Sequence, residues 1–217
     1  TTLFRSLKGK TNPSGKLAVT FPVKYEDVPS ASSFPGVPTK SPINAFYNEG
    51  IYVGYRYFDT FKVKPSYAFG YGQSYTNFSY SPLLISSKVL NGEIEVSVEI
   101  KNIGKTSGKE IVQLYISSPV SQLEKPMHEL RGFEKTRMLK PGESQVIKFK
   151  IDTNNLTSFW TGKSQWIAEK GEYKIKIASS SDNIRSTETF FLNEDVIVKQ
   201  TNDVLYPNFL IEEIIQN

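Results

Sequence analysis

Four segments of this chain alternate apolar and polar residues, which is the pattern of strands with one buried face. They are IEVSVEI at 94–100, IVQLYIS at 111–117, VIKFKI at 146–151 and YKIKIAS at 173–179. Side chains two residues apart share a face of a strand, and glycine-containing turns separate these segments. About seven short strands over roughly 110 residues is the size class of fibronectin and immunoglobulin sandwiches. We therefore predict a mainly β fold with a sandwich at residues 81–192.

An aromatic segment precedes this region. Residues 49–80 hold eleven tyrosines and phenylalanines, with Gly54, Gly70 and Gly72 between them. Alternation over Ile51–Phe58 favours an extended strand. Glycine reaches positive φ without steric cost, so the Gly-Tyr-Gly at 70–72 predicts a sharp turn.

The first forty residues are of mixed character. LFRSLKGK at 3–10 predicts a short helix, NPSG at 12–15 a turn, and LAVTF at 17–21 a short strand. Residues 23–44 contain four prolines, which disfavour both helix and central strand. This part predicts a long surface loop.

The amino-acid sequences of these segments resemble those of a known family. EGIYVGYRYFDTF at 49–61, followed by P-x-Y-x-FGYGQSYT at 65–76, is similar to the segment that joins the catalytic part of three-domain glycoside hydrolase family 3 enzymes to their fibronectin type III-like domain. NPSGKLAVTFP at 12–22 resembles the end of the family's α/β sandwich domain, although Ala18 stands where the family usually has proline.

The later strands carry the same resemblance. The segment at 96–115, ELRGFEK at 129–135 and LKPGES at 139–144 match the family's third domain in order. The resemblance implies a remnant of an α/β sandwich with its aromatic junction at 1–80, a fibronectin type III-like sandwich at 81–192, and a tail at 193–217 that the family does not explain. LIEEIIQN at 210–217 is compatible with a short amphipathic helix.

Composition narrows the possible partners. The formal charge of +4 comes from scattered lysines and arginines, so we expect a solvated surface and no nucleic-acid partner. There is no run of about 18 apolar residues, so no membrane partner is expected. The chain has no cysteine. Because Thr1 is not a methionine, we expect a fragment, a processed product or an engineered product of a longer protein. For the parent enzyme the resemblance favours an extracellular or periplasmic location.

Catalytic chemistry is not expected in this chain. Glycoside hydrolysis needs two carboxylates that flank the scissile bond. The resemblance places the family's nucleophile and acid/base upstream of Thr1, so no catalytic residue is carried over. The adjacent acidic pairs at 26–27, 194–195 and 212–213 fit solvated surface carboxylates better. With His128 as the only histidine, a two-histidine metal centre is excluded, and no cofactor is expected.

Four residues of the aromatic segment are candidates for the junction or the wall of the parent's cleft: Glu49, Tyr55, Arg56 and Asp59. We expect Arg56 and Asp59 to form an ion pair, because a charge among aromatic side chains needs a partner. We expect His128 to be exposed or hydrogen-bonded in a loop.

The tryptophans at 160 and 166 flank a turn, and two interpretations remain for them. They are either core or interdomain residues, which we prefer, or a sugar-binding pair.

Two functions compete. In the first, the chain is the non-catalytic C-terminal portion of a family 3 β-glucosidase-type exoglycosidase. Its partners would then be the N-terminal barrel and α/β sandwich of the parent, with carbohydrate substrate reached through the parent, and self-association where those parts are absent. In the second, the chain is a stand-alone fibronectin-like binding or adhesion module. The resemblance at 12–22 and 49–59 favours the first, because an adhesion domain has no use for the edge of an α/β sandwich.

Overall fold

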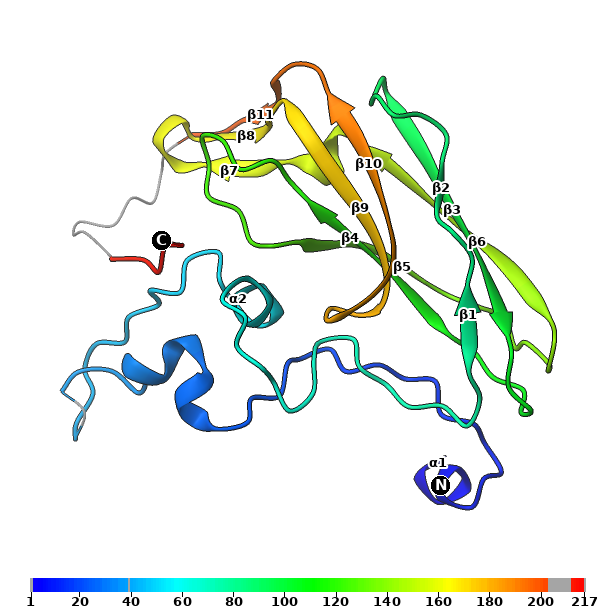
Figure 1. Ribbon diagram of the computed structural model, residues 1–217. Coiled ribbons are helices and arrows are strands. Elements are labelled where there is room, and N and C mark those ends of the chain that lie inside the picture. Colours follow the sequence, from blue (N-terminus) through cyan, green and yellow to red (C-terminus); the bar gives the residue numbers. More distant parts are fainter. Residues whose placement is uncertain (1, 39, 203–211, 217) are drawn as a thin grey trace.

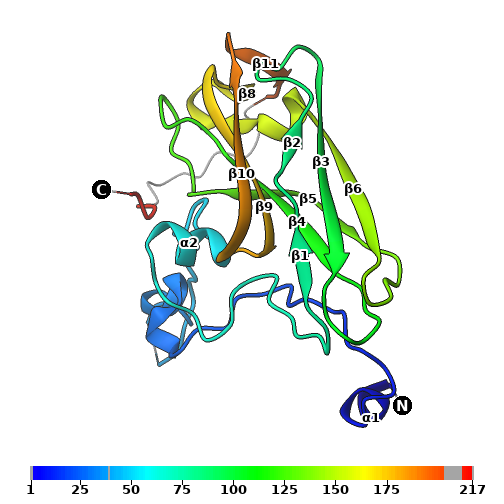
Figure 2. The same cartoon turned by 45° about the vertical axis from the view of Figure 1, so that its right-hand side comes forward.

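The computed structural model describes residues 2–38, 40–202 and 212–216. Two antiparallel four-stranded sheets face each other, and a smaller three-stranded sheet lies at one end of them (Figure 1). Figure 2 shows strands β2, β3 and β6 on one side of the sandwich and β9 and β10 on the other. The mainly β sandwich predicted from strand alternation is confirmed.

The first sheet is built around the long strand β3, to which β1, β2 and β6 pair. The second has the order β10-β9-β4-β5, and the third the order β11-β8-β7. The bounds are β1 Phe78–Tyr80, β2 Leu84–Ile85, β3 Glu93–Asn102, β4 Ile111–Ser117, β5 Glu129–Lys135, β6 Ser144–Asp152, β7 Ser158–Trp160, β8 Gln165–Ala168, β9 Gly171–Ser180, β10 Asn183–Leu192 and β11 Val196–Gln200.

The core lies between the two large sheets. On β3 the residues Ile94, Val96, Val98 and Ile100 are all buried, and the residues between them face outward. The opposite sheet supplies a parallel row of buried residues, in which Tyr173 of β9 stacks on Phe190 of β10 at 5.4 Å between ring centroids. The period-two pattern of the sequence therefore sets which side chains enter the core.

Residues 81–192 contain nine strands, where about seven were expected. Three of the nine are short: β2 has two residues, β7 three and β8 four. That hairpin pairs with β11, which begins after residue 192, to complete the third sheet.

The hairpin also corrects one part of the preferred interpretation of the tryptophans, their burial in the core, and leaves interdomain packing as an expectation. Phe159 and Trp166 lie directly opposite each other on β7 and β8, and both are 40% exposed. Trp160 is only half-buried and carries the ammonium of Lys163 over its ring at 3.7 Å. Burial of Trp166 in the core was thus wrong. Neighbouring residues of a strand point to opposite faces, and on β8 the buried residue is Ile167, while Trp166 points to the exposed face.

The N-terminal part has little regular structure. The predicted short helix is confirmed as α1, Thr2–Leu7, which lies apart from the sandwich in both views (Figures 1 and 2). The strand expected at 17–21 is wrong: only Phe21 forms a bridge, with Tyr67. The predicted loop at 23–44 contains two single turns of 3-10 helix, η1 Tyr25–Asp27 and η2 Pro29–Ser32.

The extended strand expected at Ile51–Phe58 is also wrong. Gly54 has φ +58°, which ends the extended run, and helix α2 follows at Tyr55–Thr60. In a helix, residues four apart share a face, and Tyr57 accordingly contacts Phe61 with ring centroids 5.0 Å apart. Aromatic alternation over so short a run fits both structures, and contact with the sandwich selects the helix.

The predicted helix at 210–217 lies partly outside the described residues. Its described part, 212–216, has no regular secondary structure. The amide of Ile214 donates to the carbonyl of Asn48 at 2.9 Å, so this part of the chain returns to the segment that precedes α2.

Candidate functional site

Helix α2 forms one contact between the N-terminal part and the sandwich. Its side chain Phe58 is 3% exposed, and Tyr52 just before the helix is fully buried. The hydroxyl of Tyr55 accepts a hydrogen bond from the amide of Leu130 on β5 at 2.8 Å. Burial raises the pKa of Tyr55, which keeps the phenol neutral in this contact.

A histidine and a carboxylate close one side of this contact. Nε2 of His128, a residue 3% exposed, lies 3.1 Å from Oδ2 of Asp59. The Tyr115 ring packs 4.8 Å from the imidazole, between centroids. On the other side of the ring, the Lys176 ammonium lies 3.5 Å from Nδ1. Burial lowers the pKa of Lys176, as does the like charge of Lys174.

The ion pair expected between Arg56 and Asp59 is wrong. Nη1 of Arg56 instead lies 3.4 Å from Oε1 of Glu129 on β5, while Asp59 pairs with His128. Glu129 also accepts from Nη2 of Arg131 at 2.7 Å. Both charged residues of the helix thus reach across to the sandwich, because the sandwich offers each an oppositely charged or hydrogen-bonding group.

Of the four predicted residues, Tyr55, Arg56 and Asp59 are brought together on the sandwich. Glu49 lies half-buried in the loop before α2, where its carbonyl accepts from the amide of Tyr52 at 2.9 Å. The geometry therefore gives Glu49 a backbone role in the turn that leads to Tyr52.

The loop between β4 and β5, which also carries His128, contacts the residue Tyr52 just before α2. The Tyr52 hydroxyl donates to Oε1 of Glu124 at 2.7 Å, and burial raises the Tyr52 pKa. Next to it, Nζ of Lys125 lies 2.9 Å from Oε2 of Glu169, with both side chains almost fully buried. Burial by itself raises the Glu169 pKa, but hydrogen bonds from Lys125 and Ser121 and the lysine charge outweigh it, so that the pKa is lowered.

A second contact fixes the Gly-Tyr-Gly turn. The amide nitrogen of the Gln113 side chain, on β4, donates to the carbonyls of Gly70 at 3.1 Å and Ser179 at 2.9 Å. The Tyr115 hydroxyl donates to the amide oxygen of the same side chain at 2.7 Å. Gly70 has φ +78°, as a sharp turn requires, and a Cβ there would lie 2.1 Å from the Gln113 side chain.

A third contact fixes the NPSGK segment. Asn12 accepts from the amide of Tyr75 at 2.8 Å and donates to the carbonyl of Ser107 at 3.0 Å. Nζ of Lys16 lies 2.9 Å from Oε1 of Glu110. Polar side chains of residues 1–80 therefore hold the N-terminal part to the sandwich at several separated points.

Among the described residues, the carboxylates at this contact are taken up by structural partners. Of the carboxylates at the contact, Asp59, Glu110, Glu129 and Glu169 are each engaged by a basic group or a histidine, and Glu124 accepts from the Tyr52 hydroxyl. In the described residues no group of three or more His, Asp or Glu side chains could hold a metal ion. No described helix is long and apolar enough to cross a membrane.

Comparison with known proteins agrees with the sequence resemblance. The family model of the fibronectin type III-like domain matches residues 110–181. β-Glucosidase BoGH3A of Bacteroides ovatus is 45% identical over 190 residues, which are 85% of this chain and 25% of that protein. Thermostable β-glucosidase B of Acetivibrio thermocellus is 41% identical over 213 residues, or 97% of this chain and 27% of that protein.

A solved structure shows the same fold. β-Glucosidase 3B from Thermotoga neapolitana, in complex with α-D-glucose, superposes with a TM-score of 0.85 and 46% identity, over 91% of this chain and 27% of that one. The chain corresponds to the C-terminal region of glycoside hydrolase family 3 β-glucosidases. It spans about a quarter of the length of these relatives.

For this family region, several contact residues escaped sequence reasoning. Glu124, Lys125, Glu129 and Glu169 lie between 64 and 114 positions away from the helix in the chain, so no local sequence pattern predicts their contacts. One sequence feature could have indicated these residues: a single charged residue that follows apolar residues of a strand. Glu169, which follows the buried Ile167 and Ala168, is an example. A charge in such a position requires a partner, but the sequence does not say which.

Proposed function

We propose that this chain is the non-catalytic C-terminal portion of a β-glucosidase-type exoglycosidase, in which it stabilises the enzyme and supports the catalytic part. In this proposal residues 1–80 complete the α/β sandwich domain of the parent, residues 81–192 are the fibronectin type III-like domain, and 193–217 are a tail. Tyr55, Arg56 and Asp59 hold the two together, and Glu49 shapes the loop that leads to them. The relatives that support this proposal are named as β-glucosidases, and the chain matches only 25% and 27% of their length.

One observation carries the proposal: exposed apolar side chains gather in the N-terminal part. Ile43 is 82% exposed, Tyr47 83%, Phe34 67% and Val23 65%, all within one irregular segment. This segment lies beside helix α2 rather than within the sandwich (Figure 1). Apolar surface on this scale is rarely left in contact with water, so we infer that the rest of the parent enzyme covers it.

A chimera tests the proposal. In the Thermotoga neapolitana enzyme, the matching C-terminal region is replaced by this chain, and hydrolysis of p-nitrophenyl β-glucoside is measured beside the intact enzyme and the truncated enzyme. We expect the chimera to be soluble and active, and the truncated enzyme to lose activity or solubility. Full activity of the truncated enzyme would contradict a supporting role.

The same substrate tests the chain alone. We expect no turnover above background, because the part of the chain that the structure describes engages the carboxylates at the contact in structural pairs, and hydrolysis needs a free pair for proton delivery and oxocarbenium stabilisation. Turnover that disappears on substitution of a carboxylate within residues 1–217 would show that the chain is itself an enzyme. The alternative of a stand-alone adhesion module receives no support from the relatives.

A further inference from the structure

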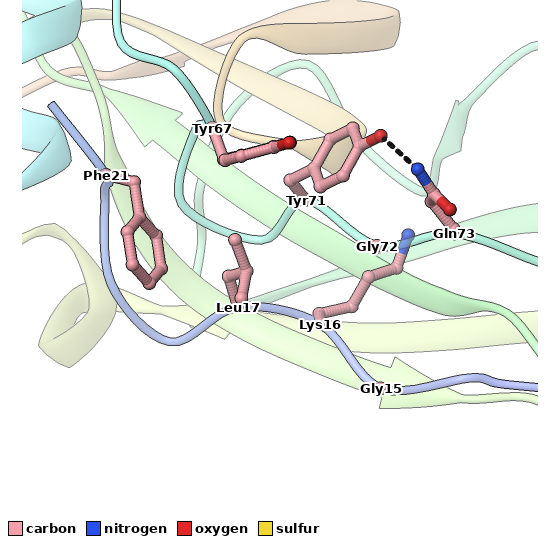
Figure 3. Close-up of a pocket in the computed structure, with 8 residues that line it drawn as sticks. All are labelled: Gly15, Lys16, Leu17, Phe21, Tyr67, Tyr71, Gly72 and Gln73. Atoms are coloured by element: carbon pink, nitrogen blue, oxygen red, sulfur yellow. Dashed lines mark hydrogen bonds between the residues drawn. The ribbon is translucent and has the colours of Figure 1, made fainter. Parts of the chain in front are cut away.

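The hollow drawn in Figure 3 belongs to the N-terminal part alone. It is lined by residues between 15 and 21 and between 67 and 73, and its rings Phe21 and Tyr67 are 46% and 49% exposed. It is therefore part of the apolar surface that the rest of the parent is proposed to cover. A different hollow, of about 370 Å³, lies where the end of helix α2 meets the sandwich, and none of the exposed apolar residues at 23–47 lines it.

Three lysines line this second site, here called the lysine hollow. Lys62 and Lys64 follow helix α2, and Lys176 comes from β9. Lys62 has φ +56°, and the amide of Val63 donates to the carbonyl of Phe58 at 2.9 Å, which is the left-handed turn that commonly ends a helix. This turn brings two exposed lysines of the N-terminal part to the half-buried lysine of the sandwich.

The two aspartates of the lysine hollow are already engaged. Oδ2 of Asp59 lies 3.1 Å from Nε2 of His128, and Oδ1 of Asp182 accepts from a serine hydroxyl at 2.6 Å. Among the ion pairs of the described residues, none includes Lys62 or Lys64. The ammonium groups of these two lysines are therefore available to an anion.

Lys176 has the surroundings of a nucleophilic amine. Its Nζ lies 3.5 Å from Nδ1 of His128. When Nε2–H of His128 donates to Asp59, Nδ1 carries the lone pair that can take a proton from this ammonium. Burial and the like charge of Lys174 lower the pKa of Lys176, against the opposing charge of Asp59. A desolvated lysine beside a base is one of the ways in which proteins activate an amine.

A buried hydroxyl in the same hollow has no partner. Ser181 is 2% exposed and lines the hollow, and its Oγ makes no hydrogen bond within the described part of the chain. A buried polar group without a partner costs free energy, so it calls for an explanation. A polar atom of a bound ligand would supply the missing hydrogen bond.

We propose that Lys176 forms an imine with a small aldehyde whose anionic group is bound by Lys62 and Lys64. Lys176 first transfers a proton to Nδ1 of His128, and the neutral amine then attacks the aldehyde carbon. One proton from the nitrogen and the proton held by His128 pass to the aldehyde oxygen, which leaves as water, and a protonated imine remains. This inference goes beyond the supporting role proposed above and does not depend on it.

The test is labelling of the full chain with para-formylbenzoate, an aldehyde with a carboxylate. Cyanoborohydride traps the imine, and mass spectrometry of the peptides locates it. We expect the label to appear first at Lys176. The neutral analogue para-formylbenzamide should react there about tenfold more slowly, because it lacks the charged hydrogen bonds to Lys62 and Lys64. The double substitution Lys62→Gln and Lys64→Gln should remove this difference between the two aldehydes.

Lys174→Arg is the matched control, because Lys174 is an exposed amine on the same strand that does not line the hollow, and arginine keeps its charge. It should leave labelling at Lys176 unchanged, whereas Lys176→Arg should abolish the label at that site. His128→Gln should slow both aldehydes alike, which separates the proton acceptor from the anion site. Thermal unfolding of each variant checks that the fold persists.

Two results overturn the proposal. Labelling of Lys176 no faster than that of Lys174 would exclude the reactive amine, and equal rates for the charged and the neutral aldehyde at Lys176 would exclude the anion site. Lys62 and Lys64 are exposed, so their variants keep the comparison decisive even where His128→Gln does not fold. None of these results bears on the chimera, so the two proposals fail separately.

Discussion

Nε2 of His128 and Oδ2 of Asp59, 69 positions apart in the chain, lie 3.1 Å apart and join helix α2 to the start of β5. Both side chains are largely buried, at 3% and 10% exposure. A buried hydrogen-bonding group that loses its partner costs free energy, and the two partners belong to different parts of the molecule. The loss of stability on breaking this pair therefore reports how strongly the N-terminal part is held to the sandwich.

Asp59→Ala should lower the free energy of unfolding by about 1–3 kcal/mol, since the buried imidazole is left without its acceptor. Urea unfolding measures the change. The control is Glu95→Ala, which removes an exposed pair with Lys148 and should cost less than about 1 kcal/mol. Equal effects of the two substitutions would show that the pair does not hold the junction.

Phe58→Ala should cost about 3–5 kcal/mol of stability, because the ring is 3% exposed and its removal leaves a cavity. Tyr67→Ala, at a ring 49% exposed, serves as the aromatic control and should cost much less. A loss below about 1 kcal/mol for Phe58→Ala would mean that α2 is a loose tether rather than part of the packed junction.

Gly70→Ala should destabilise the chain more than Gly142→Ala does. Both glycines have φ near +80°, so the backbone strain of alanine is the same. Only at Gly70 would the new Cβ collide, at 2.1 Å from the Gln113 side chain. Differential scanning calorimetry of the two variants isolates the collision, and Gln113→Ala should relieve part of it. Equal transition temperatures would contradict this packing.

The Lys125–Glu169 pair should make the free energy of unfolding depend on pH in the acidic range. The folded-state pKa of Glu169 is lowered from 4.5, so its contribution is complete above about pH 4.5 and is lost as pH falls through the lower folded-state value. Glu169→Gln should therefore flatten the fall in stability below pH 4.5. Unfolding measured between pH 3 and pH 7 at intervals, for both proteins, tests the sign. A parallel pair of curves would exclude this linkage.

The exposed apolar side chains of the N-terminal part should cause self-association when the chain is studied by itself. We expect the sedimentation coefficient to rise with concentration, and the double substitution Ile43→Ser and Tyr47→Ser to reduce that rise. Val120→Ser and Phe133→Ser change two residues of the sandwich that are 81% and 67% exposed, and they should have little effect. A monomer at all concentrations would contradict this prediction.

The sequence by itself determined the sandwich. Alternation with a period of two decides which residues of β3, β4, β6 and β9 face the core. Because this pattern involves only neighbouring residues, it can be recognised in the sequence before the fold is known. The sharp turn at Gly70 was predictable for the same reason, since positive φ is a property of one residue and its neighbours.

Only the tertiary structure decided the junction. Aromatic alternation at Ile51–Phe58 fits a strand as well as a helix, and the helix is selected by what Tyr55 and Phe58 pack against. The partners of Arg56 and Asp59 were mispredicted because the nearest opposite charge in sequence is not the nearest in space: Glu129 and His128 come from the sandwich. Burial of Trp166 likewise depends on how the third sheet is oriented, and no local pattern records that orientation.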